Sequence, residues 1–304
     1  SSPMYSNRIV CSYRYVTTQF GFPPPASKAP EHLEAMVGLG FNSVELMAVG
    51  PAHLEALTDN RSAFREKTRD ARVRIPYLSQ LLPGLSDPER NNREASLETF
   101  THACVLAEEL GAFGIIDYGP LPPVTFPSDI SEIDKYDPSI LSSAPVKSRL
   151  NWFDYWENLI DTYRQACDLA AQHNLTFSLR PTPGGLIANT DAFLYFHDEV
   201  GRNNLRFSID TSNQFAVRDN PILSLIRLHD LVDTIYLSDA SDADNLHLEP
   251  GEGVIRWDLF FEALLQFRFR GYLIVDIGGA RSEITDIDSA YKIGASMIES
   301  FLGS

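Results

Sequence analysis

Short runs rich in β-branched and aromatic residues alternate with longer amphipathic stretches along this chain, and the alternation occurs eight times. Regular alternation of this kind is typical of parallel strands joined by helical crossovers. Eight such units in 304 residues predict an α/β fold, a closed (β/α)8 TIM barrel that forms a single domain over residues 1–304. The expected strands cover residues 8–14, 42–47, 72–78, 113–118, 175–180, 205–210, 234–238 and 272–276.

The stretches between these runs predict the helices of the barrel. Asn151 and Asp288 stand where a side chain would cap a helix start, and Gly40, Gly111 and Gly271 stand where a left-handed residue would end one. An open doubly wound sheet is the alternative, and it is disfavoured because no GxGxxG motif follows the first strand. The expected helices include residues 30–39, 62–71, 90–110, 152–173, 221–229, 257–267 and 289–301.

Charge and cysteine usage limit the partners and the compartment. The formal net charge is −16, which repels a phosphate backbone, so we expect no nucleic-acid partner. Three cysteines without CxxC spacing favour free thiols in a reducing compartment, and we expect a cytoplasmic protein. The first residues show no signal-peptide pattern, and no apolar run is long enough to span a membrane, so we expect no membrane partner.

One predicted connection, over residues 119–150, is much longer than the others and is rich in proline. Loops of this length inside a compact domain are usually functional or disordered. Because it follows the fourth strand, it belongs to the catalytic face of a barrel. We interpret it as a lid over the site, and the alternative is an insertion that has no function of its own or that contacts another subunit.

Polar residues at the carboxyl ends of the strands are the candidate functional residues, because active sites of such barrels lie at that face. Asp210 and Asp276 each end an apolar strand, as a metal ligand or a general base requires, although Asp210 also fits a helix cap or a partner for Arg180. A structural salt bridge is as reasonable for Glu45 as a substrate contact. The strand-end candidates are Glu45, Tyr118, Arg180, Asp210, Asn213, Tyr236, Asp239, His247 and Asp276.

The loop after the seventh strand, residues 239–255, is rich in carboxylates. Its spacing is not that of a calcium-binding loop, so Asp242 and Asp244 are read as solvated residues. His247 differs from them because it precedes a tight Pro-Gly-Glu-Gly turn at residues 250–253. We expect its side chain to face the mouth of the barrel.

Four segments resemble the xylose isomerase-like TIM barrel superfamily, which includes sugar phosphate isomerases and epimerases. The most specific is His-Leu-Glu-Pro-Gly-Glu-Gly-Val-Ile at 247–255, together with Tyr-Leu-Ser-Asp at 236–239. The others are Gly-Phe-Asn-Ser-Val-Glu-Leu at 40–46, Phe-Ser-Ile-Asp-Thr at 207–211 and Gly-Tyr-Leu-Ile-Val-Asp at 271–276. The similarity extends over nearly the whole chain.

This resemblance implies a divalent metal, such as Mn or Zn, held by a Glu, an Asp, a His and a second Glu. The first Glu position falls on Arg180, the His position on Tyr236 and the last Glu position on Asp276, while Asp210 matches. The His that usually follows this Asp by three residues is Asn213. A guanidinium beside carboxylates repels a divalent ion, so we expect that the family's metal is lost and that there is no cofactor.

These considerations predict an isomerase- or epimerase-like enzyme of carbohydrate metabolism that moves a proton next to the carbonyl of a small polyhydroxylated or keto substrate. The predicted catalytic residues are Arg180, Asp210, Tyr236, His247 and Asp276. The predicted substrate contacts are Glu45, Tyr118, Asn213, Asp239 and Arg256. A barrel that binds a small molecule without catalysis, and a metal-dependent epimerase or dehydratase with replacement ligands, are the alternatives. The sequence leaves a homo-oligomer open.

Overall fold

The computed structural model describes residues 4–279 and 282–303. Every strand that the sequence predicts is present among these residues, and the second is interrupted at Glu45, so that the described part of the chain has nine strands. Their bounds are β1 (Ile9–Cys11), β2 (Ser43–Val44), β3 (Leu46–Val49), β4 (Tyr77–Leu81), β5 (Gly114–Tyr118), β6 (Thr176–Arg180), β7 (Leu205–Asp210), β8 (Thr234–Leu237) and β9 (Tyr272–Val275).

The helices follow the strands in the expected alternation. Four further turns of 3-10 helix are η1 (Ala26–Lys28), η2 (Pro83–Ser86), η3 (Ile133–Tyr136) and η4 (His229–Leu231). The α-helices are α1 (Arg14–Phe20), α2 (Ala29–Gly38), α3 (Gly50–Asp59), α4 (Arg61–Ala71), α5 (Arg90–Glu109), α6 (Pro138–Ser143), α7 (Trp152–Gln172), α8 (Thr190–Val200), α9 (Thr211–Ala216), α10 (Pro221–Leu228), α11 (Trp257–Gln266) and α12 (Ile287–Leu302).

The chain divides into two compact units. The first unit comprises Ser1–Leu46, Glu55–Pro76 and Ser208–Ser304, and the second comprises Met47–Leu54 and Tyr77–Phe207. In the first, the strand order is β2-β1-β9-β8-β7. All of its strand pairs are parallel, with Cys11 beside both Val44 and Val275. This register places the residues that follow β1, β2 and β9 next to one another at one edge of the sheet.

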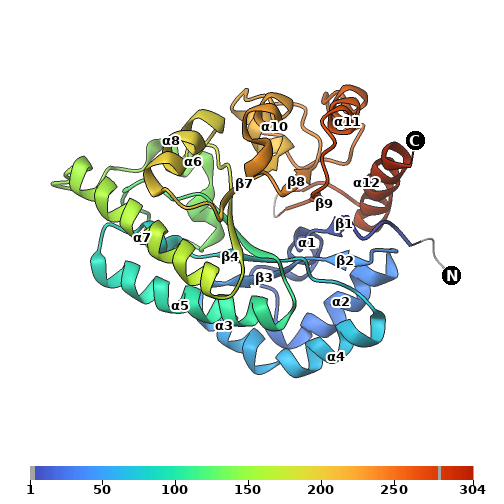
Figure 1. Ribbon diagram of the computed structural model, residues 1–304, viewed down its shortest axis with the longest axis horizontal. Coiled ribbons are helices and arrows are strands. Elements are labelled where there is room, and N and C mark those ends of the chain that lie inside the picture. Colours follow the sequence, from blue (N-terminus) through green and yellow to red (C-terminus); the bar gives the residue numbers. More distant parts are fainter. Residues whose placement is uncertain (1–3, 280–281, 304) are drawn as a thin grey trace. The chain divides into compact units, whose positions relative to one another are not determined.

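The second unit contains the order β7-β6-β5-β4-β3, with parallel pairing from β4 to β7. Helices α5 and α7 pack side by side against these strands (Figure 1). Its core is strongly aromatic: the ring of Phe177 contacts Phe100 and stacks on Tyr163, which contacts Phe196. Burying one such large apolar side chain stabilises the fold by roughly 1.5–3 kcal/mol, so this cluster fixes the position of β6.

Helix ends confirm some of the predicted caps and correct others. Asn151 accepts a hydrogen bond from the Asp154 backbone and caps α7, and Gly40 and Gly111 have the expected positive φ. The cap of α12 is Asp286 rather than Asp288, whose carboxylate instead accepts the Tyr15 hydroxyl. Gly271 does not take the left-handed conformation after α11. Arg268 takes it instead, with φ 54°.

The long connection at 119–150 is less irregular than its sequence predicts. It contains η3 and α6, and Val124 pairs with Val146 in an antiparallel bridge. The Tyr155 hydroxyl donates to the carbonyl of Leu121, which anchors the beginning of the segment to α7. Its function as a lid stays a prediction.

The three cysteines are free, as expected, and all three are buried. None of the helices in the described part of the chain combines the length and the apolar character that a membrane crossing requires.

Candidate active site

The candidate site of the first unit is built at the carboxyl ends of β1, β2, β8 and β9. Ser12 follows β1, Glu45 follows β2, Tyr236 lies near the end of β8 and Asp276 follows β9. Because these strands are parallel and neighbouring, their ends present side chains to one another. A polar group buried there needs partners, and the described contacts supply them.

Asp276 is the centre of the densest set of these contacts. Its Oδ1 accepts a hydrogen bond of 2.7 Å from the Ser12 hydroxyl and one of 2.9 Å from Nε of Arg14. Only 1% of the Asp276 side chain is exposed, against 18% for Arg14. The arginine therefore places a positive charge beside a buried carboxylate, at the entrance of the site.

His247 approaches the other oxygen of this carboxylate. Its Nδ1 lies 3.6 Å from Asp276 Oδ2 and 3.2 Å from the hydroxyl of Ser238. The residue has a positive φ of 57°, which is uncommon for residues other than glycine and asparagine. Two backbone hydrogen bonds stabilise this conformation: His247 N donates to Ser212 Oγ, and Gly278 N donates to the His247 carbonyl. Within the first unit, the His247 side chain therefore lies beside the ends of β8 and β9.

Glu45 and Tyr236 form a second buried pair. The Tyr236 hydroxyl donates to Glu45 Oε2, and the Tyr13 backbone N–H donates to Oε1. The Cys11 thiol lies in the field of Glu45 and Asp276. Burial, and then these two carboxylates, raise the pKa of Cys11 well above its usual value, so this thiol stays protonated.

Asp210 has the structural role that the sequence left open. Its Oδ1 accepts a 2.8 Å hydrogen bond from the backbone N–H of Asn213 and caps α9. Its own N–H donates to Oε1 of Gln214. Asp210 and Asn213 are therefore brought together, at the start of a short helix that follows β7.

Asp239 is the anchor of the loop after β8. Its carboxylate accepts from the N–H groups of Ala240, Gly251 and Ile255 and from the indole of Trp257, at 2.8–3.1 Å. Four donors on one buried carboxylate hold the segment 239–257 in shape.

The Pro-Gly-Glu-Gly turn in this loop is explained by the same contacts. Gly251, with φ 98°, donates to Asp239. Gly253 leaves no room for a side chain, because an added Cβ would lie 2.4 Å from the carbonyl of Ala240. Both glycines are therefore needed for the turn to wrap around Asp239.

Arg256 lies apart from these groups. Its side chain is 69% exposed and pairs with Asp258 at 2.9 Å. Among the described residues, no ion pair or hydrogen bond joins Arg256 to Asp276, His247 or Glu45 of the first unit.

Two further predicted residues, Tyr118 and Arg180, are neighbours in the second unit. The Arg180 guanidinium carbon lies 4.8 Å from the centre of the Tyr118 ring, a cation–π contact, and Arg180 is 2% exposed. Their strands pair directly, Tyr118 beside Arg180. The predicted approach of Arg180 to Asp210 and Asp276 involves both units and stays a prediction.

Comparison with known proteins identifies the family. The model of the xylose isomerase-like TIM barrel family matches residues 33–300. The chain belongs to this family. The predicted fold class, a (β/α)8 TIM barrel, and the resemblance stated from the sequence are both confirmed. No curated protein matches the chain in sequence.

Solved structures agree with the family assignment at the level of the fold. The 3-keto-D-glucoside 4-epimerase of E. coli has a TM-score of 0.71 at 17% identity, with 98% of this chain and 100% of that chain covered. A D-allulose 3-epimerase from Methylomonas sp. has 0.73 at 16%, covering 98% and 99%. The probable 3-DHS dehydratase of Bacillus anthracis has 0.63 at 16%, covering 95% and 98%.

The residues at the family's metal positions do not fit a divalent ion. Asp276 accepts from a guanidinium and a hydroxyl, the Asp210 carboxylate caps a helix, and the Tyr236 hydroxyl donates to Glu45. Throughout residues 4–279 and 282–303, no group of three or more His, Cys, Asp or Glu side chains is arranged to hold a metal ion. Two carboxylates that already bind donors, together with a tyrosine, are a poor donor set for a transition metal.

Sequence reasoning missed Ser12, Arg14, Ser212 and Ser238. Ser12 was missed because the first strand was expected to extend over residues 8–14, whereas β1 ends at Cys11 and Ser12 is the residue at its carboxyl end. Arg14 lies in the first turn of α1, and only the structure reveals that its side chain reaches back to Asp276. The two serines carry no sequence signal that separates them from other polar residues.

Proposed function

We propose that this chain is an isomerase- or epimerase-like enzyme that moves a proton next to the carbonyl of a small, sugar-like keto substrate without a metal ion. The observation that carries the proposal is the His247–Asp276 pair at the strand ends, with its 3.6 Å separation. A histidine whose ring is oriented by a carboxylate is the usual general acid–base arrangement, and histidine titrates near neutral pH.

In this proposal His247 exchanges the proton and Asp276 positions it. Asp276 is 1% exposed and its Oδ1 already accepts two hydrogen bonds, whereas the His247 side chain is 14% exposed and within reach of a ligand. The carboxylate faces Nδ1, so Nε2 is the nitrogen that would take the proton from the substrate carbon and return it. Ser238 Oγ, 3.2 Å from Nδ1, holds the ring at this angle.

The negative charge that develops on the substrate oxygen during enolisation needs a cation or a set of donors. Arg14, next to Asp276, supplies a positive charge in the first unit. Arg180 remains the predicted second cation, and Glu45, Tyr118 and Asn213 remain predicted substrate contacts. The structures with the same fold include epimerases of a 3-keto-D-glucoside and of D-allulose, which supports a hydroxyketone substrate.

Hydrogen–deuterium exchange at carbon tests the proposal without knowledge of the product. The protein is incubated in D2O and EDTA with D-fructose, D-allulose and L-ribulose, and the signal of the C–H next to each carbonyl is followed by NMR. We expect loss of that signal for at least one ketose. His247→Gln lowers the rate by roughly 10²–10⁴-fold, whereas His102→Gln, an exposed position on α5, leaves it unchanged.

Two results contradict the proposal. Exchange that disappears in EDTA and returns with Mn²⁺ identifies a metal-dependent epimerase or dehydratase. A ketose that binds, for example by calorimetry, but exchanges no proton identifies a binding barrel without catalysis.

A further inference from the structure

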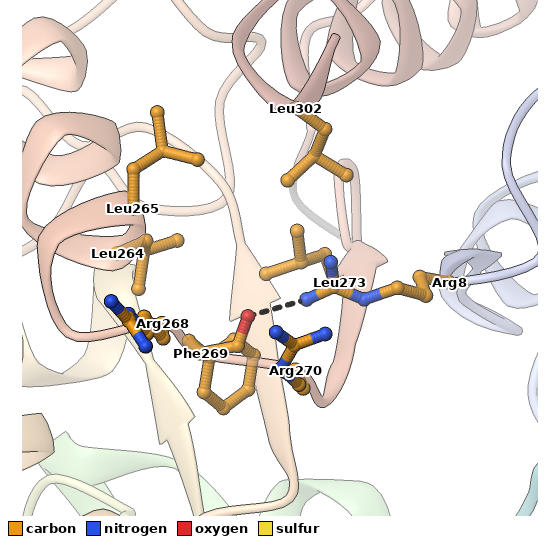
Figure 2. A pocket seen from close by; sticks show the side chains of 8 residues that line it. All are labelled: Arg8, Leu264, Leu265, Arg268, Phe269, Arg270, Leu273 and Leu302. Carbon is orange, nitrogen blue, oxygen red and sulfur yellow. Dashed lines mark hydrogen bonds between the residues drawn. The ribbon is translucent and has the colours of Figure 1, made fainter. Parts of the chain in front are cut away.

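A small pocket lined by arginines lies at the other end of the strands that carry Ser12 and Asp276. Its volume is about 220 Å³, and Arg8, Arg268 and Arg270 line it together with Leu264, Leu273 and Leu302 among other apolar residues (Figure 2). Arg8 directly precedes β1, and Arg270 lies just before β9. The pocket therefore opens at the amino ends of both strands, in the first unit.

The three arginines gather positive charge that no acidic residue of the pocket balances. All lining residues are either arginine or apolar. Within the part of the chain that the structure describes, the side chains of Arg268 and Arg270 make no ion pair or hydrogen bond. The whole chain has a net charge of −16, so this pocket is locally opposite in charge to the chain as a whole.

Arg8 is held in place by the backbone. Its Nε donates to the Gly271 carbonyl at 3.0 Å and its Nη2 to the Phe269 carbonyl at 2.8 Å, as the dashed line in Figure 2 marks for the second. In that view the guanidinium groups of Arg8 and Arg270 lie next to each other. Burial, and then the charge of Arg270, lower the pKa of Arg8, as two close cations require.

Backbone conformation also supports a role for Arg268. This residue has a φ of 54°, a left-handed conformation that glycine adopts at lower cost. Three residues later, Gly271 lacks the space for a Cβ, which would lie 2.1 Å from the Asp233 carbonyl. The α11–β9 joint thus keeps its glycine for packing and places an arginine at the left-handed position beside the pocket.

We propose that this pocket, defined by Arg8, Arg268 and Arg270, is a binding site for a phosphate group, either inorganic phosphate or the phosphate of a small ester. Guanidinium groups bind phosphate oxygens through paired, charge-assisted hydrogen bonds. The volume is below the roughly 300–1,000 Å³ of sites for drug-sized ligands, so the pocket takes one anionic group and leaves the rest of a larger ligand outside. The leucines form an apolar floor that weakens the competition from water.

This site is separate from the candidate active site and does not depend on the proposed function. Arg8 and Ser12 flank β1 (Ile9–Cys11) and are four residue steps apart, which corresponds to roughly 13 Å in an extended strand. A phosphate bound beside Arg8 therefore does not touch the His247–Asp276 pair.

Binding of inorganic phosphate, and of phenyl phosphate as a model ester, tests the site. Titration calorimetry is run in a phosphate-free buffer at constant ionic strength, with chloride as the reference anion. We expect saturable binding to the native chain. Each charge-assisted hydrogen bond to a phosphate is worth about 1.5–3 kcal/mol, so Arg270→Gln and Arg268→Asn weaken binding roughly tenfold or more.

Arg69→Gln is the matched control, because Arg69 is an exposed arginine of α4 in the same unit. This variant should bind phosphate as the native chain does. Circular dichroism and the midpoint of urea unfolding establish that each variant is folded. Tighter binding of phenyl phosphate than of inorganic phosphate identifies an ester as the ligand. The proposal is overturned if neither anion binds saturably, or if Arg69→Gln weakens binding as much as Arg270→Gln does.

Discussion

Nδ1 of His247 lies 3.6 Å from Oδ2 of Asp276, while Nε of Arg14 lies 2.9 Å from Oδ1 of the same carboxylate. One buried carboxylate thus faces two cation-forming groups, one from the first turn of α1 and one from the loop after β8. The arrangement links the orientation of the histidine ring to the end of β9.

The first prediction concerns the coupling of this pair. Asp276→Asn and His247→Gln should each lower the deuterium-exchange rate by roughly 10²-fold or more, because the histidine needs the carboxylate for its orientation and charge. The double variant should be no slower than the slower single variant, since residues that act as one unit have non-additive effects. If instead the fold reductions of the two single variants multiply in the double variant, the two residues act independently.

The second prediction concerns the loop anchor. Asp239→Ala removes the acceptor of four hydrogen bonds in a buried position. We expect the free energy of unfolding to fall by about 2–4 kcal/mol, because buried donors are left without partners, and the segment 239–257 to become sensitive to protease. Urea unfolding and limited proteolysis measure the two effects. Asp242→Ala, at an exposed residue of the same loop, should change stability by less than about 0.5 kcal/mol. Equal stability of the two variants would contradict the conclusion that Asp239 holds the loop in place.

The third prediction compares two glycines. Gly253→Ala would place a Cβ 2.4 Å from both the Ala240 carbonyl and the Asp239 carboxylate, so we expect a loss of about 1–3 kcal/mol. Gly38 lies in α2 with nothing within 4 Å of an added Cβ. Gly38→Ala should therefore stabilise the fold, by roughly 0.5–1 kcal/mol. Thermal unfolding of both variants checks the opposite signs, and a neutral Gly253→Ala would show that the turn can shift.

The fourth prediction concerns pH. Asp117 lies on β5 and accepts a 3.0 Å hydrogen bond from Gln80, and burial raises the pKa of Asp117 to about 8. The folded chain therefore keeps this proton up to about pH 8, whereas the unfolded chain loses it near pH 4. The contribution of Asp117 to stability is complete below pH 4 and falls as the pH rises toward 8, by at most about 1.4 kcal/mol per pH unit.

Asp117→Asn removes the titratable carboxyl group from the folded and the unfolded chain and keeps the shape of the side chain. The free energy of unfolding of the native chain minus that of the variant should decrease between pH 5 and 8 and level off above that range. Urea unfolding across pH 5–9 measures the difference. If this difference in free energy of unfolding stays constant with pH, the Asp117 carboxylate is ionised in the folded chain and the prediction is wrong.

Much of the fold could be predicted because the strand–helix alternation depends on local patterns. The third strand is an instructive error: residues 72–78 were expected, and the strand is Tyr77–Leu81. Val73 and Ile75 are buried and extend the apolar pattern. Pro76 has no N–H to donate to a neighbouring strand, so regular pairing begins only after it.

The site was less predictable, because strand ends identify positions but not the contacts between side chains. Asp276 and His247 were each selected because they follow a strand, and the structure places their side chains next to each other. The contact of Arg14 with Asp276 depends on the direction of a helix that begins at Arg14 itself. The four donors around Asp239 depend on a loop conformation, since positions 240 to 257 converge only after the turn has formed.

Because one carboxylate fixes the 239–257 loop, the sequence of this loop can vary during evolution at some positions and not at others. The frame of the loop is set by contacts of Asp239 with its ends, while the tip at Asp242, Ala243 and Asp244 is exposed. Substitutions at the tip therefore leave His247 where it is. Under the proposed function, the surroundings of the site can therefore vary at this tip while the His247–Asp276 pair is kept.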